Sequence, residues 1–190
     1  MSNPEKKTAR TISIIVQLLL VMYIIQIINV VTPIDLRMYG IIPKDTNQLW
    51  GIVTAPFIHG SWLHLINNSF GFATFSAICL FKGANYYFKA SVIIILLGGV
   101  LVWCFARNSV HIGASGWVFG LWSLIIATAW FERSFMNIVI SIAVIFFYGT
   151  MIFGVLPQQA HISFESHLFG AIAGIVAASI LAKNKPKTQR

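Results

Sequence analysis

A serine between small residues is the first candidate for chemistry in this sequence. Ser115 lies in the stretch HIGASGWVFG, with Gly113 and Gly116 close by, at or just before the start of an apolar run. A hydroxyl at this place can cap a helix, which is the usual role of a serine before a helix. It can also be a nucleophile whose own backbone N–H, at the positive helix terminus, stabilises an oxyanion. Taken alone, the stretch favours the cap.

A histidine in the last apolar run can supply the general base that such a serine needs. His167 lies about one turn into that run, where an ionisable ring is costly unless it has a partner. Gly170 and Gly174 follow on the same helix face, and the run after the serine has its own pair, Gly116 and Gly120. Glycines at this spacing let helices pack closely, so we predict a Ser–His dyad. The alternative is a packed histidine that donates to a backbone carbonyl.

Two further polar residues share a helix face near the outer end of the second apolar run. His64 and Asn68 are four residues apart, and both side chains can donate hydrogen bonds to an oxyanion. Hydrogen bonding between helices is the alternative role for membrane Asn and His. No acidic residue lies deep in an apolar run, which argues against a buried-acid triad; the five are Glu5, Asp35, Asp45, Glu132 and Glu165. The H-E-x-x-H pattern of an intramembrane metalloprotease is absent. We predict neither a metal nor any other cofactor.

The composition of the chain indicates that a bilayer is its solvent. Of 190 residues, 57% are hydrophobic and only 9% are charged, against roughly 25% charged in a soluble domain. The net charge of +8 could suggest nucleic acid as a partner. The basic residues are dispersed between apolar runs and clustered at the two ends, so no basic face is available and we exclude nucleic acid.

Continuous apolar runs predict an all-α membrane protein with six transmembrane helices in one domain over residues 1–190. The predicted spans are Thr11–Val31, Leu63–Phe81, Ala90–Ala106, Ala114–Phe131, Phe135–Val155 and Ile162–Ala182. With the N-terminus inside, only three of the 13 basic residues fall outside: Arg37, Lys44 and Arg107. This bias places both termini in the cytoplasm, with short tails at about 1–10 and 183–190.

One connection, residues 32–62, is much longer than the others and too apolar for a disordered segment. Its Trp50, Phe57 and Trp62 suit the headgroup zone. We predict that this first outer loop folds against or partly into the outer leaflet; a peripheral structural loop is the alternative.

The combined motifs resemble the rhomboid intramembrane serine proteases, in particular the bacterial GlpG-like members. They are G-A-S-G at 113–116, H-x-x-x-N at 64–68 and S-H-x-x-G-x-x-x-G at 166–174, and the resemblance covers nearly the whole chain. It implies a six-helix bundle in the bacterial inner membrane around a water-filled cavity open to the outer side. It also implies that Ser115 is the nucleophile, that His167 is the base, and that His64 and Asn68 stabilise the oxyanion with the Ser115 amide. The implied supporting residues are Gly113, Gly116, Phe119, Gly170 and Gly174.

The chain departs from the family pattern at a few positions. Gly51 stands where an arginine is usual in the loop signature, whose other members are Gln48, Trp50 and Thr54. Phe119 replaces a tyrosine that stacks on the catalytic ring in many relatives, and Ser166 replaces an alanine. His59 matches a loop histidine for which we expect a structural role, and for His111 we expect a surface or loop role.

The resemblance implies an endopeptidase that cleaves single-span membrane proteins in or near their transmembrane segments. Membrane lipids are the other partners that we expect. Substrate entry is expected from the side, past the fifth span or the loop at Leu156–His161. A non-catalytic rhomboid-like scaffold that binds transmembrane helices is the alternative. A small transporter would need a polar path across the bilayer, whereas the polar candidates cluster on one side.

Overall fold

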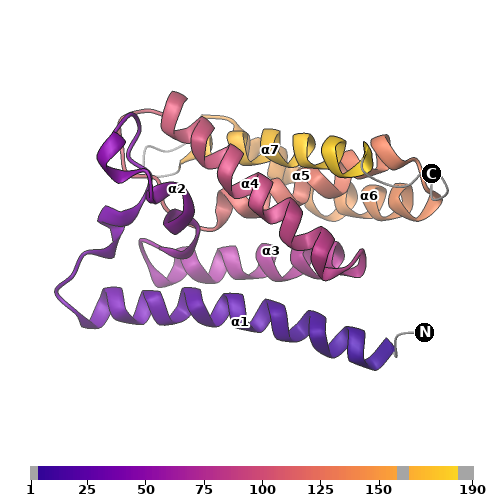
Figure 1. Ribbon diagram of the computed structural model, residues 1–190, viewed down its shortest axis with the longest axis horizontal. Helices are drawn as coiled ribbons and strands as arrows, with labels where there is room; N and C mark the ends of the chain where they lie inside the picture. Colours follow the sequence, from indigo (N-terminus) through magenta and orange to yellow (C-terminus); the bar gives the residue numbers. More distant parts are fainter. Residues whose placement is uncertain (1–3, 158–162, 184–190) are drawn as a thin grey trace.

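The computed structural model describes residues 4–157 and 163–183, and Figure 1 shows them as a bundle of long helices. Helix α5 lies in the interior, beside α4, α6 and α7, while α1 packs along α3 on the outside of the bundle. The long helices are α1 (Pro4–Val31), α3 (Trp62–Phe81), α4 (Ala84–Phe105), α5 (Ser115–Glu132), α6 (Phe135–Tyr148) and α7 (Phe164–Lys183). A 3₁₀ helix, η4 (Gly149–Val155), continues α6.

Large apolar side chains cover the outside of the bundle, as expected for helices that face lipid. Ile24 on α1 is 53% exposed and Phe146 on α6 is 80% exposed. Within the described residues, five helical segments are long and apolar enough to cross a membrane: α1, α3, α4, α6 with η4, and α7. Helix α5 is not among them. Many of its 18 residues are buried, because neighbours surround it, and its serines, glycines and tryptophans lower its mean hydropathy. The count of six spans stays a prediction.

Several helix bounds differ from the predicted spans. Helix α1 begins at Pro4 rather than Thr11, so much of the segment predicted as a tail is helical. Helix α4 begins at Ala84 rather than Ala90, because a lysine near a helix end can extend its amine to water and need not end the helix. The last span begins at Phe164 rather than Ile162, and Ile162 itself lies outside the described residues.

The first outer loop is built from short helices that lie against the bundle: η1 (Leu36–Tyr39), η2 (Thr46–Gln48), α2 (Gly51–Thr54) and η3 (Ala55–Phe57). The Ile52 side chain packs on Gly99 of α4 so closely that a Cβ there would lie 2.7 Å from Ile52 Cγ2. Trp103 of α4 donates its indole N–H to the Asp45 carbonyl, at 3.0 Å. The loop is therefore attached to α4 by both apolar and polar contacts. Its depth in a leaflet stays a prediction.

Helices α5 and α7 approach each other backbone to backbone. A Cβ on Gly170 would collide with the carbonyl oxygen of Gly116, and a Cβ on Gly174 would collide with that of Gly120. Glycines spaced by four residues on both helices thus leave room for this contact. These two glycine contacts bring the start of α5, which holds the serine, next to the start of α7, which holds the histidine.

Candidate active site

Ser115 is the first residue of α5, and its neighbour Ala114 occupies the N-cap position. The interpretation of Ser115 as the helix cap is therefore wrong, because a cap residue precedes the first helical residue. Ser115 is 8% exposed. Gly113, two residues before the serine, adopts φ +111°, a conformation that favours glycine. The N–H of Gly113 donates to the Ala55 carbonyl at 2.9 Å. The loop that precedes the serine is thus fixed in shape by a glycine and a backbone bond.

His64 and Asn68 lie directly against this loop. A Cβ on Gly113 would be 2.7 Å from His64 Cε1 and 3.4 Å from Asn68 Nδ2, so the two side chains occupy the space that glycine leaves. The start of α3 sets their position, because Ser61 caps that helix by accepting the N–H of His64 at 3.1 Å. The structure therefore brings the predicted oxyanion pair against Gly113, two residues before the predicted nucleophile.

The amide nitrogen of Asn68 is an unsatisfied donor. Asn68 Nδ2 is buried and has no hydrogen-bond partner among residues 4–157 and 163–183. A buried donor without a partner costs about 1–3 kcal/mol, and such groups are rare in folded proteins. An oxyanion bound beside Gly113 would satisfy it.

The His167 ring has a defined orientation and tautomer. Its Nδ1 lies 2.9 Å from the carbonyl oxygen of Gly154. Because a carbonyl only accepts, Nδ1 carries the proton and Nε2 keeps a free lone pair, as a general base requires. The ring also stacks on Phe119, with centroids 4.2 Å apart and planes inclined by 5°. The phenylalanine therefore supports the ring as the tyrosine of relatives is expected to do, but without a hydroxyl.

Helix geometry places His167 on the same side of α5 as Ser115. Phe119 follows Ser115 by four residues and so lies on the same face, one turn further along. A Cβ on Gly116 would be 3.0 Å from the Ser166 carbonyl, so the backbone next to the serine contacts the backbone next to the histidine. The predicted nucleophile, base and oxyanion donors thus come together from three helices, α3, α5 and α7.

His59 has a structural position behind the serine. Its Nε2 accepts the N–H of Ala114 at 3.2 Å, and its ring packs edge-on against His64 with centroids 5.1 Å apart. Burial of this loop residue lowers its pKa to about 3, with a smaller effect from His64. The ring therefore stays neutral, which it must be to accept the Ala114 N–H.

His111 is buried, at 1% exposure, so the expectation of a surface position was wrong while that of a loop role holds. Its backbone pairs with Ile41 of the first outer loop in a short β-bridge. Its Nδ1 is 2.6 Å from Ser163 Oγ, which is 2.7 Å from Ser166 Oγ at the start of α7. Burial lowers the pKa of this loop histidine. His111 thus links the first outer loop, the serine loop and α7.

Gly51 occurs where the resemblance implies an arginine, and the packing gives the reason. A Cβ on Gly51 would collide with the carbonyl of Gly40, and a Cβ on Gly40 would itself lie 2.8 Å from the His111 carbonyl. Thr54 of the same signature donates its hydroxyl to the Tyr39 carbonyl at 2.6 Å. In this chain the loop is held by close backbone contact and backbone acceptors, with no space for an arginine.

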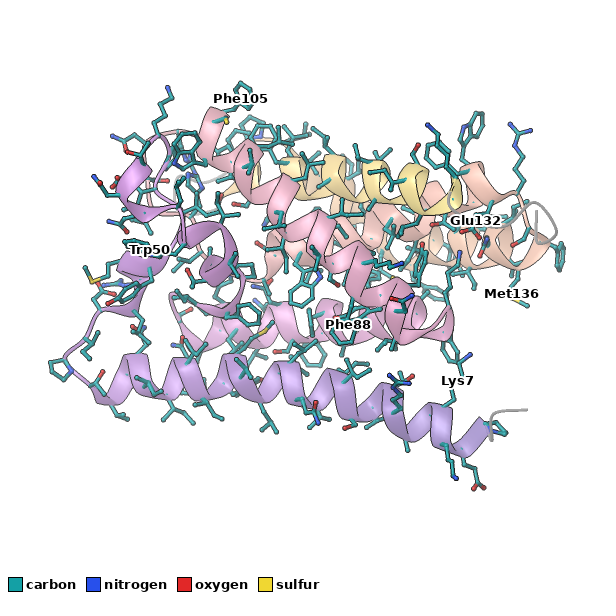
Figure 2. All side chains as sticks on the ribbon, in the orientation of Figure 1. Lys7, Trp50, Phe88, Phe105, Glu132 and Met136 are labelled. Atoms are coloured by element: carbon teal, nitrogen blue, oxygen red, sulfur yellow. The ribbon has the colours of Figure 1, made fainter. Side chains whose placement is uncertain are left out.

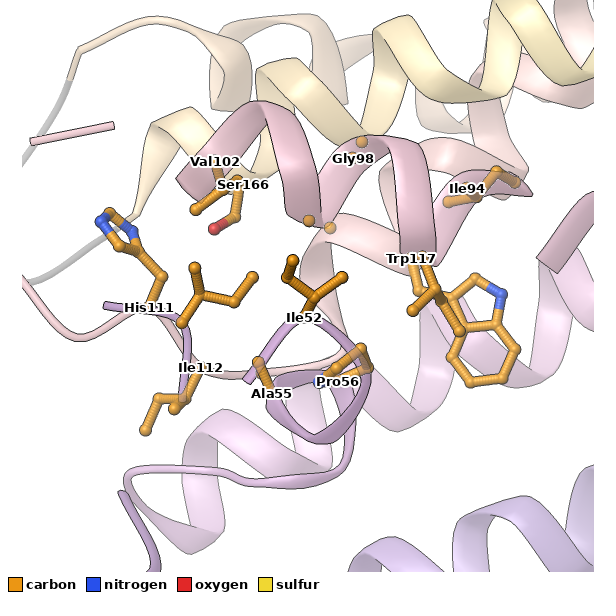
Figure 3. A pocket seen from close by; sticks show the side chains of 16 residues that line it. Ile52, Ala55, Pro56, Ile94, Gly98, Val102, His111, Ile112, Trp117 and Ser166 are labelled. Carbon is orange, nitrogen blue, oxygen red and sulfur yellow. The ribbon is translucent and has the colours of Figure 1, made fainter. Parts of the chain in front are cut away.

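A small cavity lies beside the serine loop (Figure 3). It has a volume of about 40 Å³, more than the roughly 10–15 Å³ that one water needs. Figure 3 shows Ile52 of the outer loop near the middle of this cavity, with His111 of the serine loop and Ser166 of α7 toward one side; Gly113 and Gly116 also line it. Ser115, His167, His64 and Asn68 are not among the described residues that line it, so the cavity lies behind the serine loop and not at the candidate catalytic side chains.

Sequence reasoning missed the Gly154 carbonyl, which orients the histidine. A Cβ on Gly154 would be 2.6 Å from the Phe119 ring and 3.5 Å from His167 Nδ1, so this position needs a glycine. A glycine inside an apolar run was the only available signal, and it cannot reveal which ring lies opposite. The predicted entry loop at Leu156–His161 lies, from residue 158, outside the described residues.

Comparison with known proteins shows the family of the chain. The model of the Rhomboid domain family matches residues 46–184. An uncharacterized protein of Mycobacterium tuberculosis is 32% identical over 177 residues, covering 88% of this chain and 74% of the relative. An uncharacterized protein of Mycobacterium leprae is 29% identical over 202 residues, covering 98% and 80%. Rhomboid-like protein 11, chloroplastic, of Arabidopsis thaliana is 31% identical over 147 residues, covering 69% and 52%. With its several long apolar helices, the chain is a multi-pass membrane protein, and it belongs to the rhomboid family.

Proposed function

We propose that the chain is an intramembrane serine endopeptidase that hydrolyses peptide bonds in or near transmembrane segments of membrane proteins. One observation carries the proposal most directly. The buried, unsatisfied Nδ2 of Asn68 lies against the Gly113 loop, beside a serine whose neighbouring histidine ring keeps a free Nε2. A donor without a partner and a base without a proton are the two features that acyl transfer requires.

The proposed reaction begins with attack of Ser115 Oγ on the scissile carbonyl. His167 Nε2 takes the hydroxyl proton, while its Nδ1–H remains bound to the Gly154 carbonyl. Asn68 Nδ2, His64 and the Ser115 N–H hold the resulting oxyanion. The imidazolium then gives its proton to the leaving amine, and the acyl group stays on Ser115.

Deacylation needs a water molecule at the acylated serine. His167, neutral again after it protonates the amine, takes a proton from this water, and the hydroxide attacks the ester. Collapse of the second tetrahedral intermediate releases the acid and restores the Ser115 hydroxyl.

The proposal places the site toward the outer side of a bacterial inner membrane. Lys6, Lys7, Arg10 and Lys82 lie near the end of the bundle where α1 begins and α3 ends, whereas Ser115 begins α5 at the other end. By the positive-inside rule the basic end is cytoplasmic. Single-span membrane proteins are the proposed substrates, and a lateral path past α6 is the proposed route to the site.

Active-site labelling tests the proposal. A fluorescent fluorophosphonate should label the purified wild-type protein in detergent and should not label Ser115→Ala or His167→Ala. Ser115→Ala should keep the wild-type melting temperature, whereas His167→Ala should melt lower, because it loses the hydrogen bond to the Gly154 carbonyl and the stack on Phe119. Labelling that persists in Ser115→Ala would refute the mechanism. Folded wild-type protein that neither labels nor cleaves a transmembrane substrate, but still binds it, would support the alternative, a non-catalytic scaffold.

The lateral route has its own test. Phe75 of α3 and Tyr148 of α6 are in edge-on contact, with ring centroids 5.1 Å apart. Cysteines at these two positions, joined by a short bifunctional maleimide, should block cleavage of a membrane substrate while fluorophosphonate labelling continues. Unchanged cleavage in the cross-linked protein would exclude this route.

A further inference from the structure

A pocket at the basic end of the bundle, opposite the serine and the histidine, has cationic walls. It has a volume of about 300 Å³ and lies between the start of α1 and the turn from α3 to α4. Lys6, Lys7 and Arg10 line it from α1, and Gly83 lines it from the turn. Figure 2 labels Lys7 where the start of α1 meets the end of α3.

The three cations converge because of helix geometry. Residues 6, 7, 10, 11 and 14 follow the i, i+3, i+4, i+7 pattern of one helix face, and all of them line the pocket. Glu5 precedes Lys6 by one residue and so points about 100° further round the helix, away from the centre of this face. No Asp or Glu is among the described residues that line the pocket.

The turn adds further positive potential. Gly83 is the N-cap of α4 and, having no side chain, leaves the first N–H groups of this 22-residue helix without a side-chain cap. A long helix has a partial positive charge at this end. Lys7 Nζ donates to the Phe81 carbonyl at 2.9 Å, which holds α1 against the end of α3 and keeps the pocket in shape. The charge of Lys82, next along the chain, is balanced by Glu132 at 2.8 Å.

Part of the pocket lining is apolar. Ile14 of α1, Leu80 of α3 and Ala84 of α4 line it together with the cations. A ligand for this pocket therefore combines an anionic group with an apolar part, and it approaches from the membrane along two apolar helices. Phosphate diesters of lipids have this form, and basic pockets between membrane helices are suited to them.

We propose that this pocket binds the phosphodiester headgroup of an anionic phospholipid, with Lys6 and Arg10 contacting the phosphate and Lys7 fixing the wall. The site is separate from the proposed catalytic residues, and its occupancy couples α1 to the α3–α4 turn. Free inorganic phosphate shares the anionic chemistry but lacks the apolar part, so it should bind far more weakly.

Thermal unfolding of the full chain in neutral detergent, followed by its six tryptophans, tests the proposal. Dioctanoyl phosphatidylglycerol should raise the melting temperature in a saturable way, since a ligand that binds only the folded state stabilises it. The double variant Lys6→Gln with Arg10→Gln should raise the half-saturating concentration about 30-fold, from two charges lost. The charge-conserving pair Lys6→Arg with Arg10→Lys should restore binding.

The matched control removes the same charge elsewhere at this end of the bundle. Lys89 and Arg133 do not line the pocket, so Lys89→Gln with Arg133→Gln should leave the titration unchanged. Equal titrations for wild type and the Lys6, Arg10 double variant would overturn the proposal, as would an equal loss in the control. Dioctanoyl phosphatidylcholine or inorganic phosphate acting at the same concentration would overturn the assignment to an anionic lipid.

Discussion

Replacing Gly170 with alanine should separate the proposed nucleophile from the proposed base without altering either. The new Cβ would collide with the backbone carbonyl of Gly116, the residue after Ser115. No flexible side chain is available to move, so α5 and α7 must part by on the order of 1 Å to reach ordinary contact. Misplacement of this size costs roughly 100-fold in rate, so fluorophosphonate labelling of Gly170→Ala should slow about that much.

Stability should fall less than activity. Overpacking costs about 1–3 kcal/mol, and alanine returns up to about 1 kcal/mol of helix propensity. The matched control is Gly98→Ala on α4, which faces the same Gly170. A Cβ there meets Gly170 Cα at 3.5 Å, an ordinary contact, so this variant should label like the wild type and melt no lower.

The assay is the second-order rate of labelling, measured beside the melting temperature in the same detergent. Gly170→Ala that labels as fast as the wild type would refute the argument that the glycine contact sets the Ser115–His167 geometry. The same conclusion would follow if Gly98→Ala lost as much activity, because the effect would then come from any added methyl group in this interface.

Three other changes test separate parts of the site. Asn68→Ala should lower kcat about 100- to 1,000-fold with little change in KM. Its melting temperature should stay near that of the wild type, because Nδ2 has no partner to lose among the described residues, and a large drop would indicate a structural role. Phe119→Leu should slow labelling roughly 2- to 12-fold through loss of the ring stack on His167, whereas unchanged labelling would show that the stack is not needed. Because the pKa of His59 falls to about 3 on folding, its stabilising effect is complete above pH 6.5 and declines below it. About 2 kcal/mol should be lost by pH 5, and His59→Gln should lose less between pH 7 and pH 5; an equal loss would contradict the assignment.

The long helices could be predicted because their information is local. Uninterrupted apolar runs predicted helices near the observed positions of α1, α3, α4, α6 and α7. The predicted helix bounds were wrong where charged residues extend a helix, as at the start of α1. A hydropathy pattern ends an apolar run at a lysine, although a lysine side chain can reach water from within a helix. The burial of α5 was not predictable from its composition, because aliphatic residues such as Val118, Leu121 and Ile125 suit a lipid-facing helix as well as a buried one.

Chemistry-bearing side chains could also be chosen from the sequence. A hydroxyl, an imidazole and an amide are costly inside a membrane unless they have a use, so Ser115, His167 and Asn68 were informative by type alone. Residue type alone did not predict how these side chains are arranged in space. Taken alone, the stretch around Ser115 favoured a helix cap, and only the backbone showed that Ala114 holds that position.

The sequence by itself determined the solvent, the helices and the residues able to react, because apolar periodicity and side-chain chemistry are properties of short segments. The tertiary structure alone decided what those residues contact. The Gly154 carbonyl that orients His167, and the Gly40 backbone that leaves Gly51 no room for a side chain, are main-chain groups distant in the chain. A backbone carbonyl is the same in every residue, so the sequence carries no sign of which one a buried ring will meet.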